Sequence, residues 1–234
     1  MEKPELRMSL GFSIEKARRA QRLLSRRVIR EDRFPKPIKY IGGVDVAYTE
    51  DFSIGAAVVL KMDGLEVAER RISILRSRFP YIPTLLSFRE VPPAVTAIRK
   101  LTIKPDILMV DGHGMAHPYR LGFASHLGLV LNSPTIGVAK RILCGEVKSS
   151  PNGWNFIVHE GEVIGAAIKT APKSKPIYVS VGHMISLDTA VSIVLKTVRG
   201  FRLPEPIRIA HITANEAKRR LYEGSVIGGV MGGV

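Results

Sequence analysis

The sequence predicts an α/β protein, in which helices flank a mixed sheet that is antiparallel at its start and parallel later. Three observations support this fold class. Short β-rich segments separated by turn signals occupy residues 40–75, and apolar runs without alternation follow at residues 106–111 and 134–140. Amphipathic helical patterns lie between and after these runs. Hairpins followed by alternating strands and helices are typical of layered α/β folds.

The first 75 residues are expected to form one helix and three strands. Residues 13–30 place apolar side chains at helical spacing with arginines on the other faces. They predict a basic amphipathic helix that either covers the core or contacts phosphates. Two prolines in residues 31–40 end this helix. An antiparallel meander with a turn at Asp63-Gly64 is then predicted for residues 40–49, 54–62 and 65–75.

The rest of the chain is expected to alternate between helices and strands. A Pro-bounded turn and one or two helices precede the buried strand at residues 106–111. The later elements are a helix, a buried strand, a hairpin, a strand and two helices, at residues 120–132, 134–140, 154–169, 176–182, 186–198 and 207–223. We expect a single domain, residues 1–223, followed by a frayed glycine-rich tail, residues 224–234.

Charge is the most informative part of the composition. The chain has 234 residues, with 35 Lys and Arg against 21 Asp and Glu, a formal net charge of +14. Residues 1–30 hold nine basic and three acidic side chains, and residues 112–145 hold no acid. Such clustering predicts a polyanionic partner and favours nucleic acid over a membrane surface.

Cysteine use and hydropathy exclude several classes of protein. Cys144 is the only cysteine, so the chain can form neither an internal disulfide nor a cysteine-ligated zinc or iron–sulfur site. This composition favours a cytoplasmic location. No apolar run approaches the roughly 18 residues that a membrane span needs, and the first residues lack an apolar signal core. We expect a monomer with no membrane association and no obligate protein partner.

Three carboxylates form a candidate metal site. Asp45 and Asp111 interrupt apolar strands, where an unpaired charge is costly, although Asp111 also fits an ordinary Asp-Gly turn. Glu90 lies on a predicted helix and by itself would be a surface residue. Because ligands of open α/β sheets gather outside the carboxyl ends of the strands, the three acids together predict a Mg²⁺ site. Two such ions, roughly 3.5–4 Å apart, can activate water and stabilise the departing oxygen in phosphodiester cleavage.

Four motifs then carry a resemblance to a known family. The runs GVDVAY, PYIPTLLSFRE, DGHGMAHPYRLGFASHLG and PTIGVAK resemble those of the endonuclease V family, which nicks nucleic acid near deaminated adenine. The resemblance extends from the N-terminal helix to RIAHITANEAKRR and implies a ribonuclease H-like fold. It also implies a DNA repair enzyme that binds inosine-containing DNA, with RNA as an alternative substrate. With Mg²⁺, or Mn²⁺ in its place, it would hydrolyse the second phosphodiester 3′ to the lesion, leaving 3′-hydroxyl and 5′-phosphate ends.

The resemblance assigns catalytic roles to five residues. Asp45, Glu90 and Asp111 fall on the family's metal-binding acids, and His211 falls on a histidine near the metals. Lys140 falls on the lysine close to the scissile phosphate, where an ammonium stabilises charge that develops in the transition state. Without the motifs, His211 would be interpreted as a helix-face histidine and Lys140 as a surface lysine.

The resemblance also implies a wedge that enters the duplex where the altered base leaves it. The wedge has Tyr81 at its centre and consists of Pro80, Tyr81, Ile82 and Pro83. An aromatic or proline wedge replaces lost stacking at a site where the base already pairs poorly. A core tyrosine beneath a loop is the alternative for Tyr81. Thr84 stands where glycine is common in the family, which concerns substrate preference rather than the chemistry.

A pocket for the flipped base is implied in the segment that follows Asp111. Gly112 and Gly114 lack Cβ atoms and would let main-chain groups approach the base closely. His117 is expected to touch the phosphate or the metal site, whereas His126 is expected to be structural. The spacing of His113 and His117 does not predict zinc, because no third soft ligand is evident. Tyr119 stands where the family usually has arginine.

Two other functions fit parts of this pattern. A non-catalytic reader of distorted nucleic acid needs the wedge and the basic surface but not the acids. Another ribonuclease H-like nuclease, such as one that cleaves RNA–DNA hybrids, needs the acids but not the wedge.

Overall fold

A nine-stranded mixed sheet with helices on both faces makes up the part of the chain that the structure, a computed structural model, describes. The described residues are 13–77, 79–151 and 153–230, with side chains up to residue 223. The helices are α1 Ile14–Ser25, α2 Ser87–Ile98, α3 Phe123–Leu131, α4 Leu187–Lys196 and α5 Glu205–Val230. The strands are β1 Tyr40–Tyr48, β2 Phe52–Lys61, β3 Val67–Arg76, β4 Ile107–Asp111, β5 Thr135–Ala139, β6 Glu146–Lys148, β7 Asn155–His159, β8 Glu162–Ile168 and β9 Ile177–His183.

The strand order is β3-β2-β1-β4-β5-β9-β8-β7-β6. Strands β1, β2 and β3 pair antiparallel, which confirms the predicted meander. Strand β4 pairs parallel with both β1 and β5, which confirms the predicted change to parallel pairing. Beyond β5 the sheet becomes antiparallel again, since β9 runs opposite to both β5 and β8. The parallel part of the sheet is therefore its centre, and β4 lies between two parallel neighbours.

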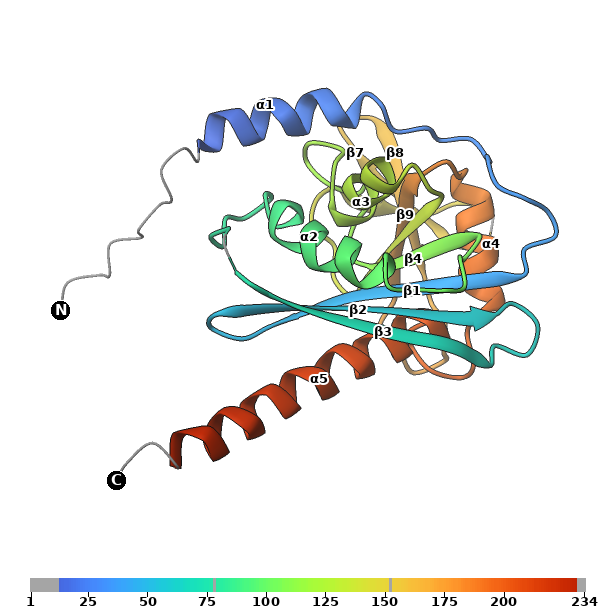
Figure 1. Cartoon of the computed structure of the whole chain (residues 1–234). Coiled ribbons are helices and arrows are strands. Elements are labelled where there is room, and N and C mark those ends of the chain that lie inside the picture. Colours follow the sequence, from blue (N-terminus) through green and yellow to red (C-terminus); the bar gives the residue numbers. More distant parts are fainter. Residues whose placement is uncertain (1–12, 78, 152, 231–234) are drawn as a thin grey trace.

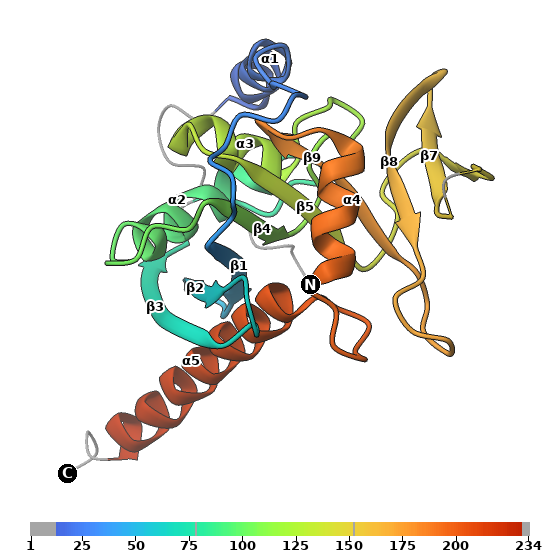
Figure 2. The same cartoon turned by 90° about the vertical axis from the view of Figure 1, so that its right-hand side faces the viewer.

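Two apolar clusters lie on opposite faces of the sheet. On one face, side chains of β1, β4, β5 and β9 pack against α4 and the start of α5. On the other face, the alternate side chains of β1 and β4 pack against α2 and α3. Figure 1 shows α5 below strands β1–β3 and α2 above them, and Figure 2 shows α4 beside β9. The meander and β4 are thus enclosed by helices on both sides.

Helices α1 and α5 depart most from the predicted ends, and α2 decides between the one or two helices predicted after the Pro-bounded turn. Helix α1 ends at Ser25, five residues before the end of the predicted helix. A single helix, α2, follows the Pro-bounded turn and contains Pro92 and Pro93 within it. Helix α5 continues to Val230, into the segment expected to be a frayed tail, and residues 231–234 of that segment lie outside the described residues.

Two carboxylates, the buried Glu69 and the more exposed Asp32, connect loops to the sheet and helices. The side chain of Glu69 on β3 is 5% exposed and accepts hydrogen bonds from the backbone N–H groups of Thr102 and Ile103, at 2.9 and 2.8 Å. Asp32 accepts from the Ser186 N–H at 2.8 Å and from the Thr189 hydroxyl at 2.7 Å, at the N-terminus of α4. Among the helices that the structure describes, none has the length and apolar character needed to cross a membrane.

Candidate active site

Asp45 and Asp111 lie side by side on neighbouring parallel strands. The register pairs Val44 of β1 with Val110 of β4, so the next residue of each strand is an aspartate. Strand β4 ends at Asp111, whereas β1 continues to Tyr48. Both carboxylates are largely buried, with side chains 11% exposed. Adjacent parallel strands therefore bring two acids, 66 positions apart in the chain, to one edge of the apolar core.

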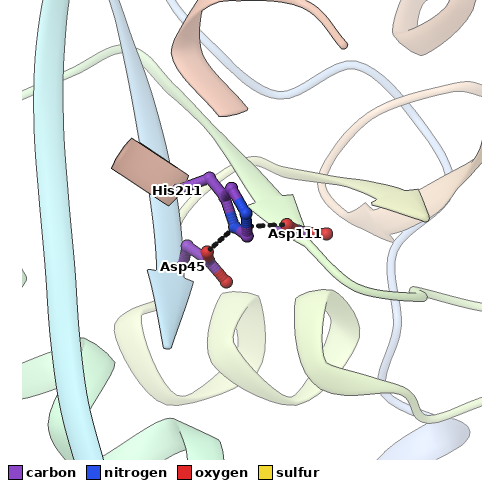
Figure 3. A group of neighbouring side chains, drawn as sticks. All are labelled: Asp45, Asp111 and His211. Atoms are coloured by element: carbon purple, nitrogen blue, oxygen red, sulfur yellow. Dashed lines mark hydrogen bonds and ion pairs between the residues drawn. The ribbon is translucent and has the colours of Figure 1, made fainter. Parts of the chain in front are cut away.

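His211 reaches the two aspartates from helix α5. Its Nδ1 lies 2.7 Å from Oδ2 of Asp45 and 3.8 Å from Oδ2 of Asp111. Figure 3 shows the three side chains pointing toward one another from β1, the end of β4 and α5. Helix α5 can approach this closely because Gly43 of β1 has no side chain, and a Cβ there would overlap the Pro206 carbonyl. Among the described residues, these three side chains form the one group of His, Cys, Asp and Glu with the geometry to hold a metal ion.

Lys140 supplies a cation to the same site. It directly follows β5, the parallel neighbour of β4, and its Nζ lies 2.6 Å from Oδ2 of Asp111. The lysine side chain is 35% exposed, so its ammonium lies between the buried carboxylate and solvent. A substrate phosphate that entered from solvent would meet this ammonium at the edge of the acidic pair.

Glu90 lies near the two aspartates, in the first turn of α2. Its side chain is outside the three-residue group, although it lies close enough for both aspartates to act on it electrostatically. Burial and repulsion from Asp45 and Asp111 raise the pKa of Glu90 to about 8. Burial and the neighbouring Asp45 also raise the pKa of Asp111, despite the attraction of Lys140. Crowded carboxylates with raised pKa values are typical of a site that gains stability when a cation binds.

A small cavity of about 210 Å³ opens onto these side chains and includes three residues that the sequence patterns did not indicate. Asn215 lies one helical turn after His211 and donates a hydrogen bond to the His211 carbonyl at 2.8 Å, with its amide nitrogen 3.3 Å from Nε2. Lys218 lies on the same helix, and Tyr48 ends β1. The i, i+4 spacing from His211 could have indicated Asn215. No sequence pattern indicates Lys218 or Tyr48.

The predicted wedge lies on the surface, before α2. The side chain of Tyr81 is 69% exposed, so Tyr81 is not a core residue beneath a loop. Pro83 is exposed, and Pro80 and Ile82 are half-buried. An exposed aromatic ring flanked by two prolines has the shape that insertion into a base stack requires.

The two glycines after Asp111 pack closely against neighbouring groups of the protein. A Cβ on Gly114 would overlap the Val181 carbonyl of β9. The N–H groups of Gly112 and Gly114 already donate to the Val138 carbonyl and to the Ser180 hydroxyl, at 3.0 and 2.9 Å. These two amides are therefore engaged within the protein, and their contact with a base stays a prediction.

His117 and His126 are buried, and His113 is partly buried. Burial lowers the pKa of His113, His117 and His126 to about 4 in each case. The Nδ1 atom of His117 accepts from the Tyr119 N–H at 3.1 Å. His126 Nδ1 lies 3.1 Å from the Ser87 hydroxyl, which agrees with the structural role expected for it. Neither His113 nor His117 belongs to the group of possible metal ligands formed by Asp45, Asp111 and His211.

Comparison with known proteins places this geometry in a family. The sequence model of the Endonuclease V family matches residues 22–212. An Endonuclease V from Thermofilum pendens is 49% identical over 214 residues, which are 91% of this chain and 92% of its own. The Endonuclease V crystal structure from Streptomyces avermitilis has a TM-score of 0.83 at 36% identity and covers 92% of this chain and 98% of its own.

A further solved structure contains nucleic acid. Endonuclease V from Ciona intestinalis, in complex with a 24mer DNA containing an inosine followed by a ribo-adenosine, has a TM-score of 0.79 at 29% identity and covers 89% of this chain and 98% of its own. These structures confirm the predicted fold class, a ribonuclease H-like mixed sheet flanked by helices. The chain belongs to the Endonuclease V family.

Proposed function

We propose that this protein is a DNA repair endonuclease that recognises inosine in DNA and hydrolyses the second phosphodiester bond 3′ to it. The observation that carries the proposal is the paired Asp45 and Asp111 on parallel strands, with His211 and Lys140 within 2.7 Å of them. The Ciona relative was solved with inosine-containing DNA, which supports the substrate class. The net charge of +14 supports a polyanionic substrate. RNA that contains inosine is the alternative substrate.

The donor set fits a hard divalent cation. Asp45 and Asp111 would hold Mg²⁺, or Mn²⁺ in its place, with Glu90 as the third acid and His211 beside them. Oxygen ligands suit these ions, and a bound cation would offset the burial and the repulsion from Asp45 and Asp111 that raise the pKa of Glu90 to about 8. When bound, the metal would supply Lewis acidity toward the scissile phosphate and activate the attacking water.

The chain's own side chains have distinct roles in this reaction. Lys140 would place its ammonium against the phosphate oxygens, where negative charge increases in the transition state. His211 holds Asp45 through their 2.7 Å hydrogen bond and so fixes one carboxylate oxygen. With its pKa raised to about 8, Glu90 would release a proton on becoming a ligand, which would make metal binding dependent on pH.

Recognition of the lesion would use the surface before α2 and the segment after β4. Tyr81, with Pro80, Ile82 and Pro83, would enter the duplex as the wedge. Inosine pairs weakly, so the cost of removing it from the stack is low. Gly112, Gly114 and His117 would line the pocket that receives it. Products with 3′-hydroxyl and 5′-phosphate ends complete the proposal. The single cysteine favours the cytoplasm, and a monomer is the default expectation.

A cleavage assay with mapped ends tests this function. A duplex with one inosine, labelled at either 5′ end, is incubated with Mg²⁺ or Mn²⁺ and compared with the unmodified duplex, an inosine-containing RNA and an RNA–DNA hybrid. We expect a single nick at the second phosphodiester 3′ to inosine, lost in Asp45→Asn and retained in Asp51→Asn, a matched change in an exposed loop. Binding without cleavage in both metals would instead support a reader, and cleavage of the hybrid alone would support another nuclease.

A further inference from the structure

The carbonyl of Thr84, directly after the wedge, is a meeting point of three segments. Thr84 has φ of +65°, in the left-handed region that β-branched residues rarely adopt. Its carbonyl accepts hydrogen bonds from Gln21 Nε2 at 2.8 Å and from Arg18 Nη1 at 3.3 Å, both on helix α1. The ring of His117, after β4, lies close enough to the Thr84 backbone for that backbone to raise its pKa against the larger effect of burial. The end of the wedge is therefore hydrogen-bonded to α1 and lies near the candidate base pocket.

Gln21 connects these segments from a fully buried position. Its side chain is 0% exposed, and Nε2 donates both to Thr84 and to the Leu121 carbonyl, at 2.8 and 3.1 Å. Its Oε1 accepts from Arg18 Nη1 at 3.0 Å. A buried amide is costly unless it is hydrogen-bonded, so these bonds fix where α1, the wedge and the Leu121 loop meet.

Arg18 makes a second set of connections between the same segments. Its Nη2 donates to the Pro83 carbonyl at 3.2 Å, within the wedge itself. Its guanidinium lies over the Tyr119 ring, 4.5 Å from the centroid, where a cation–π attraction is expected. Tyr119 follows His117 by two residues and lies on the loop of the candidate base pocket. Arg18 thus contacts the wedge on one side and the pocket loop on the other.

We propose that Arg18 and Gln21 are positioning residues that hold the wedge against the 117–121 loop, so that Tyr81 is preorganised before DNA binds. A group that is already ordered in its bound geometry loses less entropy on binding and acts at its target more effectively. The inference rests on the proposed function. It concerns only the opening of the duplex, because an inosine in a single strand has no partner base from which to be separated.

The test compares duplex and single-stranded substrates of the same sequence, each with one inosine. Gln21→Leu keeps a side chain of similar size but removes its hydrogen bonds. Arg18→Ala removes the hydrogen bonds to Thr84 and Pro83 and the contact with the Tyr119 ring. We expect kcat/KM on the duplex to fall about 10- to 100-fold, while the value on the single strand stays within about threefold. Arg18→Lys should recover part of the loss. Arg19→Ala removes an exposed arginine one residue away and should leave the duplex-to-single-strand ratio unchanged.

A measurement of base opening makes the inference independent of turnover. With 2-aminopurine opposite inosine and Ca²⁺ in place of Mg²⁺, the wild-type protein should increase the fluorescence of the probe, and Gln21→Leu should increase it less. Equal losses on duplex and single strand would overturn the positioning role. A direct phosphate contact would also overturn it. Arg18→Ala would then reduce the slope of log affinity against log salt concentration by about 0.9 and leave the duplex-to-single-strand activity ratio unchanged. A wild-type protein that opens the inosine pair but cuts neither substrate would refute the proposed function and leave the positioning role standing.

Discussion

Replacing Lys140 with methionine should slow strand cleavage by about 10²–10³-fold, the usual effect of removing one preorganised group that stabilises transition-state charge. The structure supports this magnitude. The ammonium lies 2.6 Å from an anionic oxygen of Asp111. At that separation from a phosphate oxygen, effective dielectric constants of 80 and 20 give about 2 and 6 kcal/mol. Because the lysine side chain is 35% exposed, water screens it, and we expect the lower half of this range.

The assay is single-turnover cleavage of an inosine-containing duplex at saturating Mg²⁺. Lys140→Met should reduce the rate of the chemical step, whereas Mg²⁺ affinity should not fall, because the acids remain and have lost a competing cation. Lys140→Arg keeps the charge and should retain more activity. Lys148→Met removes an exposed lysine on β6 and serves as the matched control. A rate within threefold of wild type in Lys140→Met would refute the assignment of Lys140 to the scissile phosphate.

Three further perturbations test the fold and the site. Glu69→Ala removes the acceptor of two partly buried hydrogen bonds from backbone N–H groups, each worth about 0.5–1.5 kcal/mol, so urea denaturation should show a loss of about 1–3 kcal/mol. The change Glu66→Ala, at an exposed glutamate, should have a smaller effect. Burial alone would raise the pKa of Asp32, but its hydrogen bonds lower it overall. Asp32→Asn should therefore destabilise the protein at pH 7. Thermal melts should show the difference shrink as the pH falls below about 4 and disappear once the pH is below the lowered pKa of Asp32 in the folded state. Asn215→Ala frees the His211 ring from its neighbour and should weaken Mg²⁺ binding or turnover about 10-fold, as judged by calorimetry and cleavage rates.

The sequence predicted the strands and the two aspartates because both depend on local patterns. An acid that interrupts an apolar run is visible without knowledge of the fold, and Asp45 and Asp111 were found in this way. The direction of β9 could not be predicted, because a buried strand has the same apolar pattern in parallel and antiparallel pairing. Strand β6 has three exposed residues and no pattern at all. Its existence depends on pairing with β7 rather than on its own composition.

The remainder of the site depends on contacts between distant segments. His211 was identified only through the family resemblance, since its proximity to Asp45 requires α5 to cross β1 at Gly43. Gln21 falls on the apolar side of the predicted helix, so the pattern indicates that it faces inward. Its acceptors, however, are 63 and 100 residues away along the chain. Such partners are fixed by the tertiary fold, and helical periodicity gives no information about them.

Thr84 shows how a departure from the family pattern acquires a physical meaning. From the sequence, a threonine in place of glycine concerned only substrate preference. In the structure this threonine has φ of +65°, a conformation that costs an L-residue about 1–2 kcal/mol and that glycine adopts freely. Each net hydrogen bond to its carbonyl returns about 0.5–1.5 kcal/mol, so the bonds from Gln21 and Arg18 can offset the strain. Glycine would leave the backbone of this turn flexible, whereas threonine restricts it. The hydrogen bonds from α1 then fix the position of the wedge.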